Sequence, residues 1–178
     1  LVRHGLPDVG LVTMTEMVEN ARRMADAIGI PLIADADTGY GNPLNVRRTV
    51  REYERTGVAA IHIEDQFFPK KCGHLTGKRV IPKAEMVQKV RAACEAREDP
   101  DFTIIARCDA LAVTGMEDAL DRGRAYIAAG ADVLFIESPR TLVEIETIGK
   151  AFDFPLLFNM STSGKTPFLS AADLTRLG

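Results

Sequence analysis

The sequence predicts an α/β fold whose parallel sheet is buried on both faces. Short, continuously apolar segments alternate along the chain with longer segments whose apolar residues recur at helical spacing. A strand that is buried on both faces is apolar throughout, which is the pattern found here. This order fits either a (β/α) barrel or a doubly wound sheet. No Gly-x-Gly-x-x-Gly motif follows an apolar segment, so the dinucleotide-binding form of the doubly wound sheet is not indicated.

The composition is that of a globular chain. Its 178 residues are 46% hydrophobic and 26% charged, enough for one domain over residues 1–178 with a sizeable core. A formal net charge of -3 argues against a nucleic-acid partner. No apolar run reaches the roughly 20 residues that a membrane span requires. Three cysteines without Cys-x-x-Cys spacing indicate free thiols in a reducing compartment, so we expect a cytoplasmic protein, or a mitochondrial or peroxisomal one in a eukaryote.

Five long helices are predicted from apolar periodicity and from their end signals. The first begins with the capping-box pair Thr13 and Glu16, and the second with Asn42 as N-cap and Pro43 in its first turn. Pro82 begins the third helix. Ser170 caps a further short helix, at which the sequence stops. The five long helices are predicted over residues 13–29, 42–57, 83–98, 115–130 and 141–152.

Five strands are predicted, and each ends in polar or ionisable side chains. They cover residues 31–37, 58–65, 102–110, 132–139 and 155–161. The loops that follow parallel strands open on one side of the sheet, so we expect these side chains to share one pocket. The side chains are Asp35, Asp37, Glu64, Asp65, Arg107, Asp109, Glu137, Asn159 and Ser161.

Asp35 and Asp37 are candidate metal ligands. They lie two residues apart on a predicted strand, so both are expected on the same side. Converging carboxylates form an oxygen-rich site suited to Mg²⁺ or Mn²⁺. An Asp-x-Asp pair at a strand end can instead begin a turn or cap a helix. Glu64 at the next strand end, with Arg107 beyond it, favours the metal site.

Cys72 is the candidate reactive thiol. It lies in a polar loop, residues 67–79, between Lys70 and Lys71 on one side and His74 on the other. Nearby cations stabilise a thiolate. The alternative is an incidental free thiol in a solvated loop. The residues alone leave open whether the thiol acts as nucleophile or as acid.

Three other residues of reactive type are assigned to the interior. Cys108 lies on a predicted strand and is expected to pack in the core. Cys94 lies on an alanine-rich helix and is expected to be a buried apolar residue. His62 lies within a strand and is expected to be a core histidine whose hydrogen bonds are satisfied.

Five longer motifs follow one another along the chain: ADADTGYGNPLNV, HIEDQ, PKKCGHLTGKR, FTIIARCDA and GADVLFIESP. Together they resemble the isocitrate lyase and phosphoenolpyruvate mutase superfamily, and most closely its 2-methylisocitrate lyase and 2,3-dimethylmalate lyase members. The resemblance implies a (β/α)8 barrel of which the chain covers about five units, with two units expected before Leu1 and one after Gly178. It also implies a homotetramer whose last helix is exchanged between subunits.

The resemblance also implies roles for individual residues. Asp35, Asp37 and Glu64 would hold Mg²⁺, or Mn²⁺ in its place, and Cys72 would be the catalytic acid. The chain would then belong to a lyase that cleaves a carbon–carbon bond of a small 2-hydroxy di- or tricarboxylate, giving a 2-keto acid and a carboxylate. The residues implied to bind this carboxylate substrate are Gly73, His74, Arg107, Glu137, Asn159 and Ser161.

Two departures from the superfamily pattern keep other activities open. Thr162 stands where the lyases often have glutamate, and Cys108 stands where threonine is common. A carboxyphosphonoenolpyruvate phosphonomutase-like enzyme or an oxaloacetate hydrolase or decarboxylase is therefore an alternative. An alternative of another class is an inactive fragment or a scaffold subunit, because the expected outer barrel units are missing from the sequence.

Overall fold

A computed structural model describes residues 5–73, 75–160, 164 and 166–177 of the chain. Its sheet has four parallel strands in the order β1-β2-β3-β4, as predicted for an α/β fold. None of the described helices has the length and apolar content needed to cross a membrane. The elements are α1 (Met14–Ala27), β1 (Ile33–Asp35), α2 (Pro43–Glu54), β2 (Ala60–Glu64), α3 (Lys83–Ala96), β3 (Thr103–Cys108), the 3₁₀ turn η2 (Ala110–Ala112), α4 (Met116–Ala128), β4 (Val133–Ile136), α5 (Leu142–Ala151) and α6 (Ala171–Leu177).

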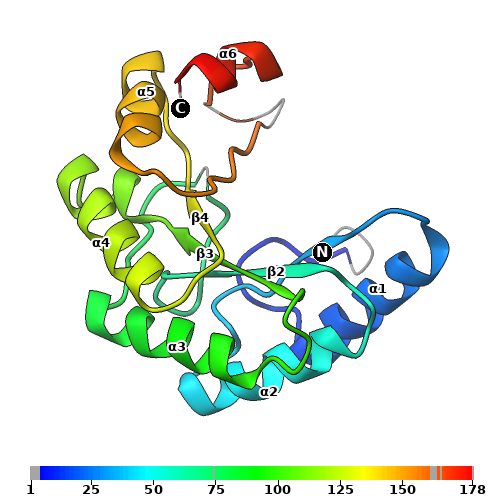
Figure 1. Cartoon of the computed structure of the whole chain (residues 1–178). Helices are drawn as coiled ribbons and strands as arrows, with labels where there is room; N and C mark the ends of the chain where they lie inside the picture. The colour runs from blue at the N-terminus through cyan, green and yellow to red at the C-terminus, as the bar shows by residue number, and fades with distance from the viewer. Residues whose placement is uncertain (1–4, 74, 161–163, 165, 178) are drawn as a thin grey trace.

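The strand order identifies the sheet as part of a (β/α) barrel. Successive strands along the chain are also neighbours in the sheet. The helices α2, α3, α4 and α5 follow one another around one side of it, and each contacts the next (Figure 1). A doubly wound sheet would instead reverse its strand order and place helices on both faces. The chain thus carries consecutive units of a barrel whose other face is the barrel interior.

Alternate residues of each strand face two different surroundings. The outer set, for example Ile61, Ile63 and Ile104, packs with the helices in the main hydrophobic cluster. The inner set includes a second, small apolar cluster formed by Ala60, Ile105 and Phe135. Towards the carboxyl ends of the strands this inner set becomes polar. The apolar layer therefore supports a ring of ionisable groups at one end of the barrel interior.

The predicted helix starts are confirmed. Thr13 and Glu16 form a reciprocal capping box at α1, and Asn42 caps α2 with Pro43 in its first turn. Pro82 is the N-cap of α3. The Ser170 hydroxyl accepts a hydrogen bond from the backbone N–H of Asp173 at 3.1 Å, which caps α6. These local signals identify the correct starts because the cap bonds involve only neighbouring residues.

The fifth strand was predicted over residues 155–161, and its described residues, 155–160, do not form a strand. Its contact with β4 is a single parallel bridge between Leu134 and Leu156. The Leu134 N–H donates to the Pro155 carbonyl at 3.0 Å, and the Leu157 N–H donates to the Leu134 carbonyl at 2.9 Å. The ladder stops because β4 ends at Ile136 and Ser138 turns the chain with a φ of 59°. The segment is extended but has no strand to pair with further along.

A buried polar network ties α4 to the ends of β2 and β3. Asp65, directly after β2, accepts hydrogen bonds from the Tyr126 hydroxyl at 2.7 Å and from Arg122 Nη1 at 3.2 Å. Its other oxygen accepts from the backbone N–H of Asp109 at 2.8 Å. Burial raises the pKa of Asp65, and these donors oppose that effect. The network holds the two strand ends that carry site residues in a defined relation.

Replacing Tyr126 by phenylalanine tests this network. The variant removes a hydrogen bond to a buried carboxylate, so we expect the free energy of unfolding to fall by about 1.5–3 kcal/mol. The comparison variant is Tyr40→Phe, which removes a 3.2 Å contact between two hydroxyls and should cost less, about 0.5–1.5 kcal/mol. Urea unfolding followed by circular dichroism measures both. Equal losses in the two variants would contradict a special role for the Asp65 network.

Candidate active site

The carboxyl ends of the strands bring several of the predicted site residues together on the inner face of the sheet. Glu64 on β2 lies opposite Arg107 on β3, and Asp35 ends β1 beside His62 of β2. Glu137 follows β4, and its N–H donates to the Cys108 carbonyl of β3 at 2.9 Å. Four neighbouring strands therefore supply side chains to one edge, as expected from parallel pairing.

Arg107 is the central cation of this edge. Its Nε donates to Asp109 Oδ2 at 2.9 Å, and its Nη2 donates to Asp109 Oδ1 at 3.2 Å. Its Nη1 lies 3.3 Å from Glu64 Oε2, and its Nη2 lies 3.9 Å from Glu137 Oε1. Burial disfavours the charged guanidinium, but the surrounding carboxylates outweigh it and raise the pKa of Arg107. Arg107 therefore stays charged and is held in one orientation by three acids.

Glu64 is the carboxylate with the least compensation. Its side chain is 0% exposed, and neither oxygen has a hydrogen-bond partner among the described residues. Burial raises the pKa of Glu64 well above its usual value, and the charge of Arg107 offsets only part of this. A buried carboxylate without donors is costly unless a further cation or proton neutralises it. Glu64 is therefore the carboxylate of this edge that the described cations compensate least.

Asp35 and Asp37 lie close together, but not for the reason that strand alternation suggested. The strand ends at Asp35, and Asp37 adopts a left-handed turn with a φ of 47°. The Asp37 N–H donates to Asp35 Oδ1 at 2.8 Å, and the Glu64 N–H donates to the Asp37 carbonyl at 2.9 Å. Burial and the neighbouring Asp35 charge raise the pKa of Asp37. Burial also opposes ionisation of Asp35, but electrostatic interactions with His62 and Lys70, together with the hydrogen bond from the Asp37 N–H, outweigh it and lower the pKa of Asp35.

Lys70 is a site residue that the sequence did not single out for this position. Its side chain is 2% exposed, with Nζ 2.6 Å from Asp37 Oδ1 and 2.5 Å from Asp8 Oδ1. Burial disfavours its charge, but Glu64, Asp35 and Asp37 outweigh burial and raise the pKa of Lys70. The sequence placed Lys70 near the thiol as one loop cation among several. The structure instead turns its ammonium towards the acids at the strand ends.

The loop that carries Cys72 is anchored against this edge. The Cys72 side chain is partly exposed, and its backbone N–H donates to the Asp8 carbonyl at 3.2 Å. Gly73 approaches the edge so closely that a Cβ there would lie 2.1 Å from Glu137 Oε1 and 2.8 Å from Arg107 Nη2. The absence of a side chain at Gly73 therefore lets the loop backbone reach the charged groups.

The remaining predicted site residues and the cysteines lie in different surroundings. Asn159 is exposed, and no described contact joins it to the charged edge. His74, Ser161 and Thr162 lie outside the described residues. The three described cysteines are free thiols. Cys108 is buried in the main hydrophobic cluster as expected, whereas Cys94 is only partly buried and donates to the Gly130 carbonyl at 3.1 Å.

The expectation for His62 was wrong. Its side chain lies on the inner face, and Nδ1 has no hydrogen-bond partner among the described residues. The Nδ1 atom lies 3.6 Å from Asp35 Oδ1. Burial lowers the pKa of His62, which Asp35 only partly opposes, so the ring is held neutral at pH 7. His62 borders the charged edge because alternation along β2 places it on the same face as Glu64.

The donor set suits a hard cation, although no metal site is assembled. In the part of the chain that the structure describes, no three His, Cys, Asp or Glu side chains form a group that could hold a metal ion. The acids of the edge are nevertheless oxygen donors, and both Glu64 oxygens are buried without a hydrogen bond in the described residues. Hard divalent cations such as Mg²⁺ prefer such ligands. The residues present therefore fit Mg²⁺ by their chemistry.

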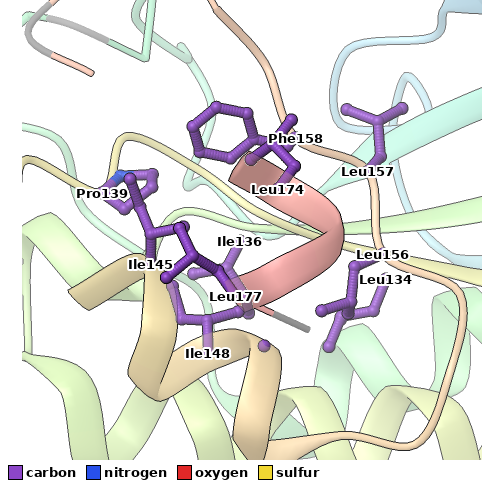
Figure 2. Close-up of a pocket in the computed structure, with 11 residues that line it drawn as sticks. Leu134, Ile136, Pro139, Ile145, Ile148, Leu156, Leu157, Phe158, Leu174 and Leu177 are labelled. Carbon is purple, nitrogen blue, oxygen red and sulfur yellow. The ribbon is translucent and has the colours of Figure 1, made fainter. Parts of the chain in front are cut away.

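A separate apolar pocket lies away from this edge. It has a volume of about 260 Å³ and is enclosed by β4, α5, α6 and the segment after α5 (Figure 2). Its lining side chains include Ile136, Ile145, Leu156, Leu174 and Leu177, and none of the lining residues is ionisable. The pocket contains no group able to take part in acid–base or metal chemistry. The charged edge, where ionisable side chains from four strands converge, is the candidate active site.

Comparisons with known proteins agree with this geometry. The family described as phosphoenolpyruvate phosphomutase matches residues 2–178. A 2,3-dimethylmalate lyase of Eubacterium barkeri is 53% identical over 174 residues, covering 98% of this chain and 60% of the relative. A 2-methylisocitrate lyase of Shewanella oneidensis is 42% identical over 175 residues, with the same coverage. The chain thus spans about three-fifths of the length of these relatives.

Two solved structures extend the comparison to the fold. An oxaloacetate acetylhydrolase bound to the inhibitor 3,3-difluorooxalacetate has a TM-score of 0.94 and 39% identity, covering 98% of this chain and 61% of that chain. A phosphonopyruvate hydrolase in complex with oxalate and Mg²⁺ has a TM-score of 0.86 and 38% identity, covering 99% and 61%. The superfamily suggested by the sequence motifs is confirmed, and the chain belongs to the phosphoenolpyruvate phosphomutase family within the phosphoenolpyruvate mutase and isocitrate lyase superfamily.

Proposed function

We propose that the protein is a Mg²⁺-dependent lyase that cleaves a carbon–carbon bond of a small 2-hydroxy di- or tricarboxylate of the dimethylmalate or methylisocitrate type. One observation carries the proposal: a buried ring of acids around Arg107 lies directly against the loop that holds Cys72. The 53% identity to a 2,3-dimethylmalate lyase supports this choice of reaction. By the same resemblance we also propose a cytoplasmic homo-oligomer.

Arg107 and the backbone around Gly73 are proposed to bind the substrate carboxylate. A guanidinium recognises a carboxylate through paired N–H donors, and Arg107 is already oriented by Asp109 and Glu64. Glu137 lies beside Arg107 on the same side of Gly73 and can accept a hydrogen bond from a substrate hydroxyl. His74, Asn159 and Ser161 are proposed as further substrate contacts on the basis of the family resemblance alone.

Asp35, Asp37 and Glu64 are proposed to hold the Mg²⁺ ion. The uncompensated Glu64 carboxylate and the mutual repulsion of Asp35 and Asp37 support this assignment. Bound there, Mg²⁺ would supply Lewis-acid stabilisation of negative charge that develops on a substrate oxygen. Lys70, between Asp37 and Asp8, contributes fixed positive charge beside the same acids.

Cys72 is proposed as the general acid. The substrate hydroxyl would lose its proton to a carboxylate of the charged edge and become the keto group, while the bond to the carbon next to the second carboxylate breaks and leaves a carbanion on that carbon. The Cys72 Sγ–H would donate its proton to that carbon and complete the carboxylate product. The thiol is partly exposed, and the next residue, Gly73, lies against Glu137 and Arg107, which supports contact between the thiol and a bound substrate.

A hydrolase acting on a small keto acid is the second candidate. The oxaloacetate acetylhydrolase structure, with a TM-score of 0.94, supports it. A phosphonomutase of the carboxyphosphonoenolpyruvate type is another alternative activity. These enzymes would use the same charged edge, so they differ from the lyase in the bond that is broken and in the product released.

A product assay distinguishes these reactions. The purified protein is incubated with Mg²⁺ and, in parallel, dimethylmalate, methylisocitrate, oxaloacetate and phosphonopyruvate. We expect release of a 2-keto acid from dimethylmalate or methylisocitrate, measured by a coupled dehydrogenase and confirmed by mass spectrometry. Release of oxalate from oxaloacetate, or of phosphate from phosphonopyruvate, as the only reaction would replace the lyase proposal by a hydrolase.

Cys72→Ser tests the role of the thiol. A serine hydroxyl is a much weaker acid than a thiol, so turnover is expected to fall on the order of 10²- to 10⁴-fold. Steady-state kinetics on the substrate identified above measures the loss. Cys94→Ser is the matched control, because Cys94 lies on α3 and contacts Gly130 rather than the charged edge. Near-parental turnover in Cys72→Ser would remove Cys72 as the acid.

Mg²⁺ binding is tested by thermal stability. Because the ion is expected to bind only the folded protein, a concentration about 100 times the Kd should stabilise it by about 2.7 kcal/mol, seen as a higher Tm. Asp35→Asn should abolish most of that increase, whereas Asp26→Asn, at an exposed position on α1, should leave it intact. An equal increase in both variants would place the ion elsewhere.

A further inference from the structure

Lys78 is a second buried lysine in the loop of Cys72. Its side chain is 2% exposed, although it lies in a polar segment that the sequence suggests is solvated. Its Nζ donates to Asp109 Oδ1 at 2.7 Å and to the Gly73 carbonyl at 2.6 Å. A buried ammonium is retained only where strong acceptors replace its water. Here one acceptor belongs to the charged edge and the other to the residue next to Cys72.

The Gly73 peptide is held from two directions. Its carbonyl accepts hydrogen bonds from Lys78 Nζ and, at 3.2 Å, from the Ser138 hydroxyl. Its Cα faces Glu137 and Arg107 so closely that there is no room for a Cβ. Lys78 comes from the far end of the loop and Ser138 from the turn after β4. Two separate parts of the chain therefore converge on the one carbonyl that follows Cys72.

We propose that Lys78 is a positioning residue, which fixes the Gly73 carbonyl to Asp109 and thereby sets the place of the Cys72 thiol relative to Arg107. The proposal rests on the proposed function, because the position of the thiol affects catalysis only if Cys72 is the general acid. Asp109 is the common acceptor, because it binds both Lys78 and Arg107. The group that binds the substrate carboxylate and the group that donates the proton are thus held by the same buried aspartate.

Lys78 is not required merely to neutralise Asp109. Arg107 already gives Asp109 two hydrogen bonds, and the Asp109 backbone is held by Asp65. The neighbouring Lys71 shows the contrast, since among the described residues its Nζ bonds to the carbonyls of Thr76 and Gly77 within the loop. Lys78 is therefore the loop lysine whose bond joins the thiol's neighbour to the strand ends.

Alkylation of Cys72 by iodoacetamide measures this positioning without any substrate. The rate for Cys72 is followed by peptide mass spectrometry across pH, in the parent, Lys78→Met and Lys83→Met proteins. The plateau at alkaline pH reports access to the thiol, because the thiol is fully ionised there. Loss of a hydrogen bond to a charged group shifts the equilibrium for opening of the Cys72 loop by roughly tenfold or more. Because the open loop exposes the thiol to iodoacetamide, we expect a plateau rate about tenfold higher in Lys78→Met. Lys83, an exposed lysine on α3, is the matched control and should leave the rate unchanged.

Ser138→Ala provides a second variant that keeps every charge. It removes the hydroxyl that lies 3.2 Å from the Gly73 carbonyl and 2.9 Å from Glu137 Oε1. Because this contact to Gly73 is longer than that of Lys78, a smaller increase in the plateau rate is expected, and this variant decides the matter if Lys78→Met does not fold. A plateau rate equal to that of the parent in a folded Lys78→Met protein, or in Ser138→Ala where it is the deciding variant, overturns the proposal.

Kinetics separates the proposal from the proposed function. With the substrate found in the product assay, Lys78→Met should lower kcat about tenfold and change KM less, because Arg107 keeps its bonds to Asp109. Raised alkylation in a protein without lyase activity would support the positioning role and reject the lyase. Lyase activity that depends on Cys72, together with unchanged alkylation in Lys78→Met, would support the lyase and reject the positioning role of Lys78.

Discussion

The structure depends on one constraint: several carboxylates are buried together at the inner edge of the sheet and must be compensated there. Three cations do this, and each binds more than one acceptor. Arg107 contacts three acids, Lys70 joins Asp8 to Asp37, and Lys78 joins Asp109 to the loop backbone. Buried charges are tolerated only with such pairing. Because the cations come from the Cys72 loop and from β3, compensation of the acids also fixes where the thiol lies.

The apolar layers make this arrangement possible. The outer residues of the strands pack with the helices, so the strands are held in parallel register and their ends coincide. The small inner cluster of Ala60, Ile105 and Phe135 lies below the charged edge and separates it from the other end of the sheet. Asp65 then joins Tyr126 of α4 to the backbone of Asp109. A polar site of this kind needs rigid support, because small displacements would leave buried charges unpaired.

The elements and much of the site were predictable because their signals are local. The caps at Thr13, Asn42 and Ser170 were identified correctly, and four of the predicted strands formed. Strand ends led to Glu64, Arg107 and Glu137, since parallel strands present their ends at one edge. The fifth strand was not predictable in the same way. Its residues are apolar, but pairing requires a partner, and β4 turns away after Ile136.

By itself the sequence determined the order of strands and helices, the acids at the strand ends and the family motifs around Cys72, because periodicity and short motifs depend on neighbouring residues. Only the tertiary structure decided which cations are buried with those acids. Lys70, Lys71 and Lys78 look alike in the sequence, yet Lys71 stays within the loop and the other two reach buried carboxylates. That difference depends on how the loop packs against distant strands, and burial of a charge is decided by such contacts rather than by residue type.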